Sequence, residues 1–405
     1  MLKIEVKGLT KIFGKNPKHG IRLLEEGKSK TDILKETGMT VGVNRVSFEV
    51  QAGEVFVIMG LSGSGKSTLV RLINRLIEPN AGSVLVDGED LAIMDKNKLR
   101  QTRRKKLSMV FQGFGLFPHR TILENAGYGL EVQGMKKSEI QEIARKSLEM
   151  VGLVGYADQY PSQLSGGMKQ RVGLARALAN DPDILLMDEA FSALDPLIRK
   201  EMQDELLGLQ LSMHKTIIFI THDLDEALKI GDRIAIMKDG IIAQIGTPEE
   251  IMTNPADDYV RKFVEDVDRS KVFSAQHVMK RPETIEVEKH GPRVALQRMK
   301  QAGISSIYVV NKNREFLGVV TADAASEAVK NGNKDIYDVM ITDVPVVAPD
   351  LSLNDLFEII HNSPVPVAVV EDKILKGIIV RGAVLAALAG NEVNLNDTNT
   401  TITNS

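Results

Sequence analysis

A glycine-rich run, G-L-S-G-S-G-K-S at residues 60–67, constrains the fold of this 405-residue chain more than any other feature. An apolar run precedes it and an amphipathic segment, residues 68–76, follows, which predicts a strand, a tight loop and a helix. Glycines let backbone N–H groups converge on phosphate oxygens. In such a loop Lys66 reaches the β- and γ-phosphates and the Ser67 hydroxyl ligates Mg²⁺. The alternative is a glycine-rich turn that fits by chance, and the flanking strand and helix argue against it.

Apolar runs alternate with amphipathic helical patterns from residue 4 to about residue 263. This alternation predicts an α/β domain with a largely parallel sheet. We expect strands at residues 54–59, 106–111, 184–187 and 216–220, because each run is apolar or β-branched and ends in turn or polar residues. The first six residues also alternate as a strand does.

Two acidic residues, Asp188 and Glu189, follow the strand predicted at residues 184–187. Ligands of an open parallel sheet bind at the carboxyl ends of its strands. Asp188 therefore suits a Mg²⁺ role, and Glu189 is free to polarise an attacking water. Taken alone, the pair is equally well explained as a solvated turn.

A second glycine motif, L-S-G-G-M-K-Q-R at residues 164–171, precedes a helix predicted at residues 172–179. Ser165, Gly166 and Gly167 expose backbone donors at a helix N-terminus, which favours anions. One chain needs only one phosphate cradle, so the second predicts a site completed on another copy of the chain. A helix cap would explain Ser165 but not the paired glycines.

With these motifs in this order, residues 1–263 resemble the ATP-binding-cassette (ABC) family. The resemblance implies that Gln112 senses Mg²⁺ and the attacking water, and that His222 reaches the γ-phosphate. It also implies a D-loop, S-A-L-D at residues 192–195, and an adenine-stacking role for Phe13. Two departures are Met168, where the family usually has Gln, and an insertion at about residues 15–40.

The resemblance assigns the following roles. Nucleotide contact is expected from Phe13, Gly60, Ser62, Gly63, Ser64, Gly65, Lys66, Ser67 and Thr68. Catalysis is expected from Glu189, His222 and Gln112, and Mg²⁺ binding from Ser67, Gln112 and Asp188. Contact with the ATP of the other subunit in a homodimer is expected from Ser165, Gly166, Gly167 and Asp195.

An internal duplication follows the charged stretch at residues 264–269. Residues 274–330 and 335–390 repeat each other at offsets of 61, 60 and 59 positions. Each copy predicts strand, helix, strand, turn, strand and helix, and a unit this small must pack on its twin. A chance likeness is the alternative. The tail, residues 391–405, is rich in Asn and Thr and is predicted to be disordered.

The duplicated segment resembles a tandem cystathionine-β-synthase (CBS) module. Cassette, insertion and CBS pair together resemble the ATPase subunits of importers for osmoprotectants of the glycine betaine/proline betaine type. That resemblance implies a membrane permease subunit with a substrate-binding domain. It also implies an adenine nucleotide, in this family cyclic di-AMP, as a regulator of the CBS module. Thr321 and Asp323 could hold its phosphate and ribose, and the second copy lacks both groups.

Composition limits the kinds of partner and ligand that the chain can bind. The formal net charge is −3, so no global basic field attracts nucleic acid, and the absence of cysteine excludes disulfides and thiolate metal sites. The longest apolar runs are too short to cross a bilayer, and the alternating first six residues lack the apolar block expected of a signal peptide. We expect a soluble chain held by the permease at the cytoplasmic face of the membrane. Two basic stretches, residues 11–35 and 96–106, are either solvated faces or contacts with anionic lipid.

One further segment, F-G-L-F-P-H-R at residues 114–120, resembles the importer segment that receives a coupling helix of the membrane subunit. Local packing explains its aromatics equally well. Three other functions stay open. They are an importer ATPase for another small solute such as an amino acid, a CBS-based nucleotide-sensing scaffold, and a mechanical ATPase acting on nucleic acid.

Overall fold

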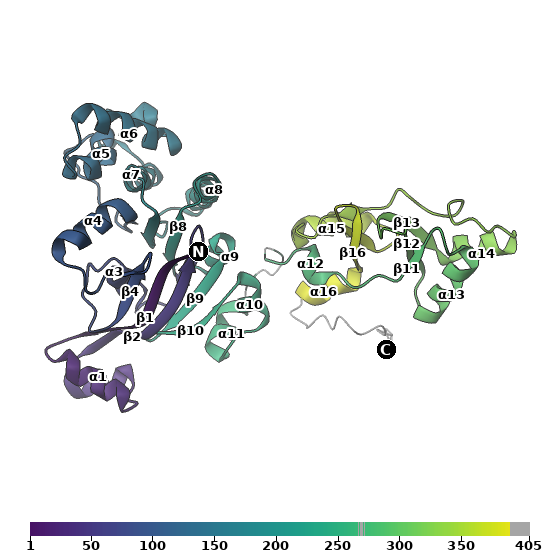
Figure 1. Ribbon diagram of the computed structural model, residues 1–405, viewed down its shortest axis with the longest axis horizontal. Helices are drawn as coiled ribbons and strands as arrows, with labels where there is room; N and C mark the ends of the chain where they lie inside the picture. Colours follow the sequence, from purple (N-terminus) through teal and green to yellow (C-terminus); the bar gives the residue numbers. More distant parts are fainter. Residues whose placement is uncertain (266, 268–269, 271, 389–405) are drawn as a thin grey trace. The chain divides into compact units, whose positions relative to one another are not determined.

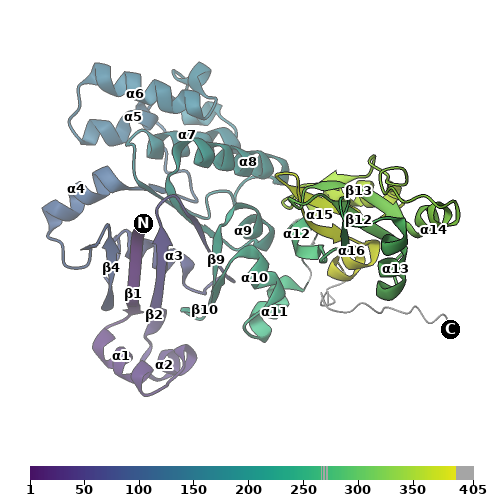
Figure 2. The same cartoon turned by 45° about the vertical axis from the view of Figure 1, so that its right-hand side comes forward.

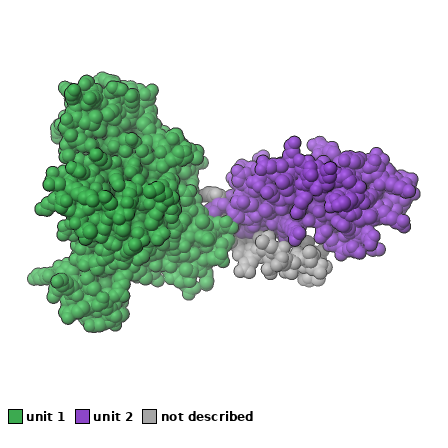
Figure 3. All heavy atoms as spheres, in the orientation of Figure 1, with its two compact units in different colours: residues 1–267 green, residues 268–405 purple. Residues whose placement is uncertain are grey.

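The computed structural model describes residues 1–265, 267, 270 and 272–388, and the chain divides into two compact units, residues 1–267 and 268–405 (Figure 3). The tail predicted to be disordered, residues 391–405, lies outside the described residues. Within the described residues, no helix combines the length and the apolarity needed to cross a bilayer.

A six-stranded sheet forms the centre of unit 1 (Figure 1), with the strand order β10-β9-β3-β8-β7-β6. All neighbouring pairs are parallel except β9 and β10. The four strands predicted from apolar runs are present, with ends that differ by one residue at most. The strands are β3 (Val55–Met59), β6 (Leu107–Val110), β7 (Ile184–Asp188), β8 (Thr216–Thr221), β9 (Arg233–Lys238) and β10 (Ile241–Gly246). β3, β7 and β8 are buried along their whole length, which explains their continuous apolar sequences.

An antiparallel sheet of four strands, in the order β2-β1-β4-β5, packs against the parallel one. Its strands are β1 (Leu2–Phe13), β2 (Thr40–Gln51), β4 (Ala81–Val86) and β5 (Glu89–Asp90). The rings of Phe48 on β2 and Phe56 on β3 stack with their centroids 4.9 Å apart, so one hydrophobic core spans both sheets. The sequence predicted only the first strand of this second sheet, because its pairing is long-range.

Three helices of unit 1, α5, α6 and α7, lie side by side and form a separate helical subdomain (Figures 1 and 2). Other helices cover the sheets. The helices of unit 1 are α1 (Pro17–Glu25), α2 (Lys30–Thr37), α3 (Lys66–Ile73), α4 (Lys96–Lys106), α5 (Ile122–Val132), α6 (Lys137–Met150), α7 (Gly166–Leu178), α8 (Pro196–Met213), α9 (Leu224–Ile230), α10 (Pro248–Thr253) and α11 (Asp258–Val264), with short 3₁₀ turns at Val154–Tyr156 and Pro161–Gln163.

Two of these helices begin earlier than predicted. α3 begins at Lys66 rather than residue 68, directly after Gly65. α7 begins at Gly166 rather than residue 172, because the Ser165 side chain caps it by accepting from the backbone N–H of Met168. The paired glycines therefore lie in the first turn of the helix and not in a loop before it.

Unit 2 contains the two predicted copies, each with a three-stranded sheet in chain order. The first copy comprises α12 (Ala275–Val278), β11 (Thr284–Glu286), α13 (Pro292–Ala302), β12 (Ser306–Val310), β13 (Phe316–Thr321) and α14 (Ala322–Lys330). The second comprises β14 (Val346–Val347), α15 (Leu353–Asn362), β15 (Val367–Glu371), β16 (Ile374–Ile379) and α16 (Arg381–Leu388). A shared cluster that includes Tyr308, Val319 and Ala368 joins the copies, so the predicted packing of one copy on the other is confirmed.

Candidate active site

The phosphate loop lies between β3 and α3, as the sequence predicts. Gly60 has a φ of +149°, and a Cβ there would lie 2.3 Å from the carbonyl oxygen of Met237. Gly65 has a φ of +107°, and its Cβ would lie 2.3 Å from the carbonyl oxygen of Gly42. Only glycine fits these two positions, because both the backbone conformation and the neighbouring carbonyls exclude a side chain.

Lys66 and Ser64 are the buried polar side chains of this loop. Lys66 is 5% exposed, and its Nζ donates to the carbonyl oxygens of Gly60 at 2.8 Å and Leu61 at 3.2 Å. Burial lowers the pKa of Lys66, against the raising effect of Glu189 and Asp188. The buried Ser64 hydroxyl has no hydrogen-bond partner among the described residues. An unpaired hydroxyl and a desolvated ammonium in one loop both favour an anionic ligand.

Asp188 and Ser67 meet beneath the loop. The Ser67 hydroxyl donates to Asp188 Oδ1 at 3.0 Å, and burial raises the pKa of Asp188. Both side chains offer the hard oxygen ligands that Mg²⁺ takes. No cluster of three or more His, Cys, Asp or Glu side chains suited to a metal occurs among the described residues. A protein site for Mg²⁺ commonly supplies only one or two side chains, with waters and substrate phosphates as the other ligands. These two residues fit a magnesium ion that is carried in with a nucleotide.

Glu189 is the residue on which the other predicted catalytic groups converge. Gln112 Nε2 donates to Glu189 Oε2 at 3.0 Å, and His222 Nδ1 lies 3.6 Å from Glu189 Oε1. Lys66 Nζ lies 4.0 Å from the same Oε1 atom. Glu189 has a φ of +46°, a left-handed conformation that a glutamate adopts only at a cost of about 1–3 kcal/mol. The chain thus holds this carboxylate in a strained position at the mouth of the phosphate loop.

Phe13 and Thr68 lie on either side of Gly42. A Cβ on Gly42 would lie 2.8 Å from Phe13 Cε2 and 3.2 Å from Thr68 Cγ2. The Phe13 ring is 39% exposed, and Lys11 Nζ lies 5.3 Å from its centroid. Phe13 is therefore partly exposed beside the helix that follows the phosphate loop, where the resemblance expects adenine to stack, and the Lys11 ammonium lies over its ring.

The second glycine motif stays apart from this site within one chain. Among the described residues, no hydrogen bond or ion pair joins residues 165–167 to residues 60–68. Gly167 has a packing role that the sequence did not reveal, because its Cβ would lie 2.5 Å from Ile198 Cγ2 on α8. Asp195 caps α8 by accepting from the backbone N–H of Ile198 at 3.2 Å. Both predicted trans elements thus begin helices; Ser165, Gly166 and Asp195 are exposed, whereas Gly167 is buried.

The structure adds Arg71, which the sequence analysis missed, and shows a contact of Ser192, in the predicted D-loop, that its motif did not reveal. Ser192 Oγ accepts from Gln112 Nε2 at 3.3 Å. Arg71 lies with a guanidinium nitrogen 3.9 Å from Asp188 Oδ2. The spacing of Arg71, four residues after Ser67 on the same helix face, is the signal that could have found it.

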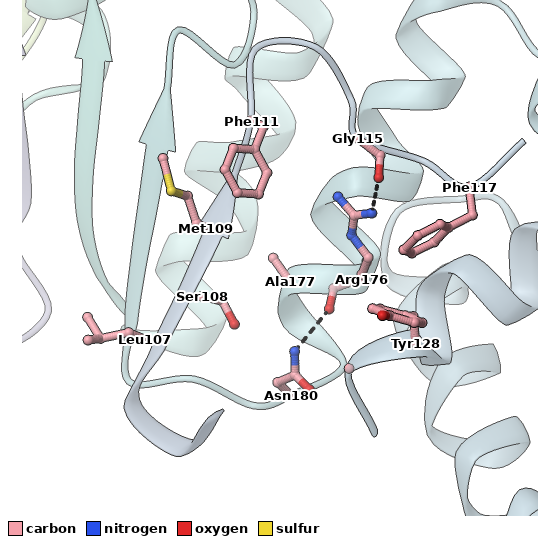
Figure 4. Close-up of a pocket in the computed structure, with 11 residues that line it drawn as sticks. Leu107, Ser108, Met109, Phe111, Gly115, Phe117, Tyr128, Arg176, Ala177 and Asn180 are labelled. Carbon is pink, nitrogen blue, oxygen red and sulfur yellow. Dashed lines mark hydrogen bonds between the residues drawn. The ribbon is translucent and has the colours of Figure 1, made fainter. Parts of the chain in front are cut away.

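A cavity of about 380 Å³ lies beside the aromatic segment at residues 114–120 (Figure 4). Arg176 on α7 fixes the segment by donating to the carbonyl oxygens of Gly115 at 2.6 Å and Phe114 at 3.0 Å. The rings of Phe117 and Tyr128 line the cavity, with centroids 4.5 Å apart. The aromatics are therefore shared between local packing and an accessible, mostly apolar hollow.

The two residues predicted for a regulatory ligand lie at the start of α14. Thr321 caps this helix by accepting from the backbone N–H of Ala324 at 3.3 Å, and Asp323 is exposed in its first turn. Neither residue lines the polar cavity of about 590 Å³ that unit 2 contains.

The fold and the phosphate site define an ABC-type ATPase followed by a tandem CBS module. The ABC transporter family model matches residues 43–192, and the CBS domain model matches residues 275–331 and 336–390. A solved structure similar to unit 1 is the ABC transporter cassette MJ0796, described as a dimer in a post-hydrolysis state with ADP and Pi. It has a TM-score of 0.52 and 32% identity, and the match covers 60% of this chain and 98% of that one.

Relatives that match nearly the whole chain show which kind of ABC ATPase it is. The chain is 62% identical over 396 residues to the glycine betaine/carnitine transport ATP-binding protein GbuA of Listeria monocytogenes, covering 98% of this chain and 100% of the relative. It is 60% identical to the glycine betaine transport ATP-binding protein OpuAA of Bacillus subtilis, covering 98% and 94%. It is 50% identical to ProV of the Escherichia coli glycine betaine/proline betaine transport system, covering 97% and 99%. The chain belongs to the family of ATP-binding subunits of glycine betaine/proline betaine ABC importers.

Proposed function

We propose that this chain hydrolyses ATP to power the import of a quaternary-ammonium osmoprotectant, such as glycine betaine, through a partner membrane subunit. The observation that carries the proposal is the convergence of Gln112, His222 and Lys66 on Glu189 at the phosphate loop. The substrate follows from relatives that match almost the whole chain and are named for glycine betaine transport.

In the proposed reaction, Glu189 is the general base. It accepts a proton from the water that attacks the γ-phosphorus, and the bond to the β-phosphate oxygen of the departing ADP breaks. Gln112 orients the carboxylate by its hydrogen bond to Oε2. Lys66 and the N-terminus of α3 hold the phosphate groups, while His222 lies within reach of the γ-phosphate. The neutralisation of phosphate charge that Mg²⁺ supplies when bound would involve Ser67 and Asp188.

The working unit in this proposal is a homodimer. The phosphate loop of one chain holds ATP, and residues 165–167 of the partner close over it with the N-terminus of α7. The separation of the two motifs within one chain supports this arrangement, and so does the dimeric form of the similar cassette MJ0796. ATP then closes the dimer, and its hydrolysis opens it again.

The membrane partner docks, in this proposal, at the cavity bounded by Phe117, Tyr128 and Arg176 (Figure 4). Its apolar walls suit a short helix end from a permease subunit that also carries a substrate-binding domain. Docking there places the chain at the cytoplasmic face of the membrane. The same cavity lies next to the strand that leads to Gln112, so a movement of the permease reaches the site of hydrolysis through a few residues.

Unit 2 regulates transport in this proposal. Its polar cavity of about 590 Å³ is lined by four cations and one acid, which are Arg281, Arg298, Arg314, Lys376 and Glu283. This charge balance supports an anionic ligand such as cyclic di-AMP or another adenine nucleotide. The alternative function, a nucleotide-sensing scaffold, would use the same cavity as its main output.

Ionic strength is the second proposed signal, read through contacts with anionic lipid. In the basic stretch that forms α4, Lys98 and Lys106 pair with Glu89 and Asp87. Arg103 and Arg104 donate to backbone carbonyls. Arg103 and Arg104 keep their charge but are held by these bonds, so lipid contact would depend most on the three other bases of the helix, which are Lys96, Arg100 and Lys105.

Reconstitution with its membrane subunit in liposomes tests the proposal. We expect ATP-dependent uptake of glycine betaine that excess proline betaine competes away and that Lys66→Ala abolishes. Uptake of an amino acid in its place would favour the alternative importer. A rate of ATP turnover that is unchanged by the membrane subunit but raised by nucleic acid would favour the mechanical ATPase. Nucleotide binding without transport would favour the scaffold.

A further inference from the structure

One side chain joins the insertion between β1 and β2 to the phosphate loop. Lys30, the first residue of α2, donates from Nζ to the carbonyl oxygen of Gly63 at 2.9 Å, although the two residues are 33 positions apart. Gly63 is exposed and has a φ of +79°, and a Cβ on it would meet no atom within 4 Å. Backbone hydrogen bonds hold the neighbouring Ser64, from its N–H to the carbonyl oxygen of Leu61 and from the N–H of Gly240 to its own carbonyl oxygen, and Lys30 adds a contact at the carbonyl of Gly63.

The insertion is held firmly enough to place that side chain. Its two ends are adjacent, because Phe13 pairs with Thr40 across the β1–β2 hairpin, and α1 and α2 lie beside the ends of these strands (Figure 2). Its own hydrophobic cluster continues the hairpin. The buried members are Ile12, Leu23, Ile33, Met39 and Val41. The insertion is thus a packed extension of the sheet rather than a loose loop.

The backbone of Lys30 is fixed by the start of α2. Ser29 caps the helix by accepting from the backbone N–H of Asp32 at 3.1 Å, and Asp32 completes a capping box. Lys28, two residues earlier, forms an ion pair with Glu36. For Lys30, by contrast, no carboxylate of the described residues lies within ion-pair distance. Its charge is therefore not neutralised within the part of unit 1 that the structure describes.

Two ammonium groups therefore hold the carbonyls of this loop from different elements. Lys66 binds those of Gly60 and Leu61, and Lys30 binds that of Gly63. A donor on the Gly63 carbonyl polarises the peptide group that carries the Ser64 N–H, and so strengthens the bond by which this N–H donates to the carbonyl oxygen of Leu61 at 3.1 Å and holds the loop closed. The Lys30 charge also adds to the positive potential over the loop.

We propose that Lys30 is a positioning residue of the nucleotide site, through which the insertion fixes the phosphate loop and raises its affinity for the phosphate groups of ATP and ADP. This inference rests on the proposed ATPase function and gives residues 15–40 a role in it. Lys30 acts through the loop and not on the reacting atoms, so binding should change and the chemical step should not.

Three variants of the full chain test this role: Lys30→Gln, Lys30→Arg and, as a matched control, Lys28→Gln. Calorimetry would measure the Kd of ADP in the presence of Mg²⁺, at low and at high salt. The reconstituted transporter would give KM and kcat for ATP. We expect Lys30→Gln to raise Kd and KM by about fivefold with kcat unchanged. The salt dependence of its Kd should be flatter than that of wild type. Lys30→Arg and Lys28→Gln should behave as wild type.

The inference is overturned if Lys30→Gln binds ADP as tightly as Lys28→Gln, if Lys30→Arg loses as much affinity as Lys30→Gln, or if the salt dependence is unaltered. A fall in kcat alone would equally overturn it. A wild-type chain that bound ADP but did not hydrolyse ATP would instead be a failure of the proposed function.

Discussion

Burial disfavours the charged forms of both Lys66 and Asp188 at the phosphate loop, and so shifts their pKa values in opposite directions. It lowers the pKa of Lys66 and raises that of Asp188, so the folded protein disfavours the ammonium of one and the carboxylate of the other. Their opposite charges lie near enough to offset part of this cost. The remainder is strain that a bound nucleotide and its magnesium ion would relieve.

Asp188→Asn should therefore stabilise the protein in the absence of nucleotide. Because burial raises the folded-state pKa of Asp188, ionisation lowers stability at pH values above its unfolded-state pKa. We expect the melting temperature to rise by ~2 °C at about pH 7, and the gain to vanish at pH values below ~3, where the carboxyl is protonated in both states. Asp181→Asn, on an exposed side chain that pairs with Lys215, serves as the control and should not gain. A lower melting temperature for Asp188→Asn at neutral pH would contradict this account.

Glu189→Gln should separate binding from chemistry. The amide keeps the length of the side chain and an oxygen that accepts from Gln112, but it cannot take a proton from water. Turnover should fall by about 10²–10⁴-fold while the Kd for ATP stays within a factor of about two, measured by phosphate release and by calorimetry. Glu201→Gln, on the exposed face of α8, is the matched control. Rapid multiple turnover by Glu189→Gln would assign the base elsewhere.

At the scale of elements, local patterns predicted what local interactions determine. β3, β7 and β8 were evident because burial on both faces leaves only apolar residues in them. The predicted start of α7 was wrong because paired glycines are typical of a loop, although the Ser165 cap starts the helix in front of them. The contact of Lys30 with Gly63 had no local signal at all, because it depends on how the insertion packs.

The same distinction applies to the site. The order of the motifs predicted Gln112, Glu189 and His222, and the structure brings these three side chains together. Motif order could not show that Gly167 is needed for packing against Ile198, because that contact joins α7 to α8. The pairing of β1 with β4 was missed for the same reason, since residues 71 to 82 positions apart in sequence meet there.

In unit 2, Tyr308 is the element-level link between the two copies. Its hydroxyl, on the buried strand β12, donates to the carbonyl oxygen of Pro366, just before β15, and burial raises its pKa. Tyr308→Phe keeps the ring and leaves that carbonyl without its partner, which should cost about 1–3 kcal/mol of unfolding free energy. Urea unfolding and calorimetry should show a lower free energy of unfolding for unit 2. The unfolding transition of unit 1, recognised because ADP shifts it, should be unchanged. Tyr337→Phe, on an exposed side chain, should be neutral, and equal stability of both variants would show that the hydrogen bond contributes nothing.

At the scale of the whole molecule, the question is which chain completes each ATP site. In one chain the phosphate loop and the first turn of α7 share no hydrogen bond or ion pair among the described residues. A site completed in trans makes hydrolysis a property of the dimer, and couples ATP binding to the approach of two subunits. A site completed within one chain would need α7 to move against its own phosphate loop.

Two inactive variants distinguish these cases. Lys66→Ala removes the phosphate-binding ammonium. Gly166→Asp places a carboxylate in the first turn of α7, where the helix tolerates it and its nearest neighbour is Leu194 at 3.8 Å, but where it repels the phosphate of ATP. In a mixed dimer formed in trans, one site carries both defects and the other carries neither. A 1:1 mixture of the two proteins, reconstituted with the membrane subunit, should therefore regain roughly a quarter of wild-type ATP turnover. Each parent alone should stay inactive. If the mixture is as inactive as its parents, although exchange of subunits is verified with labelled chains, each chain completes its own site and the trans arrangement is wrong.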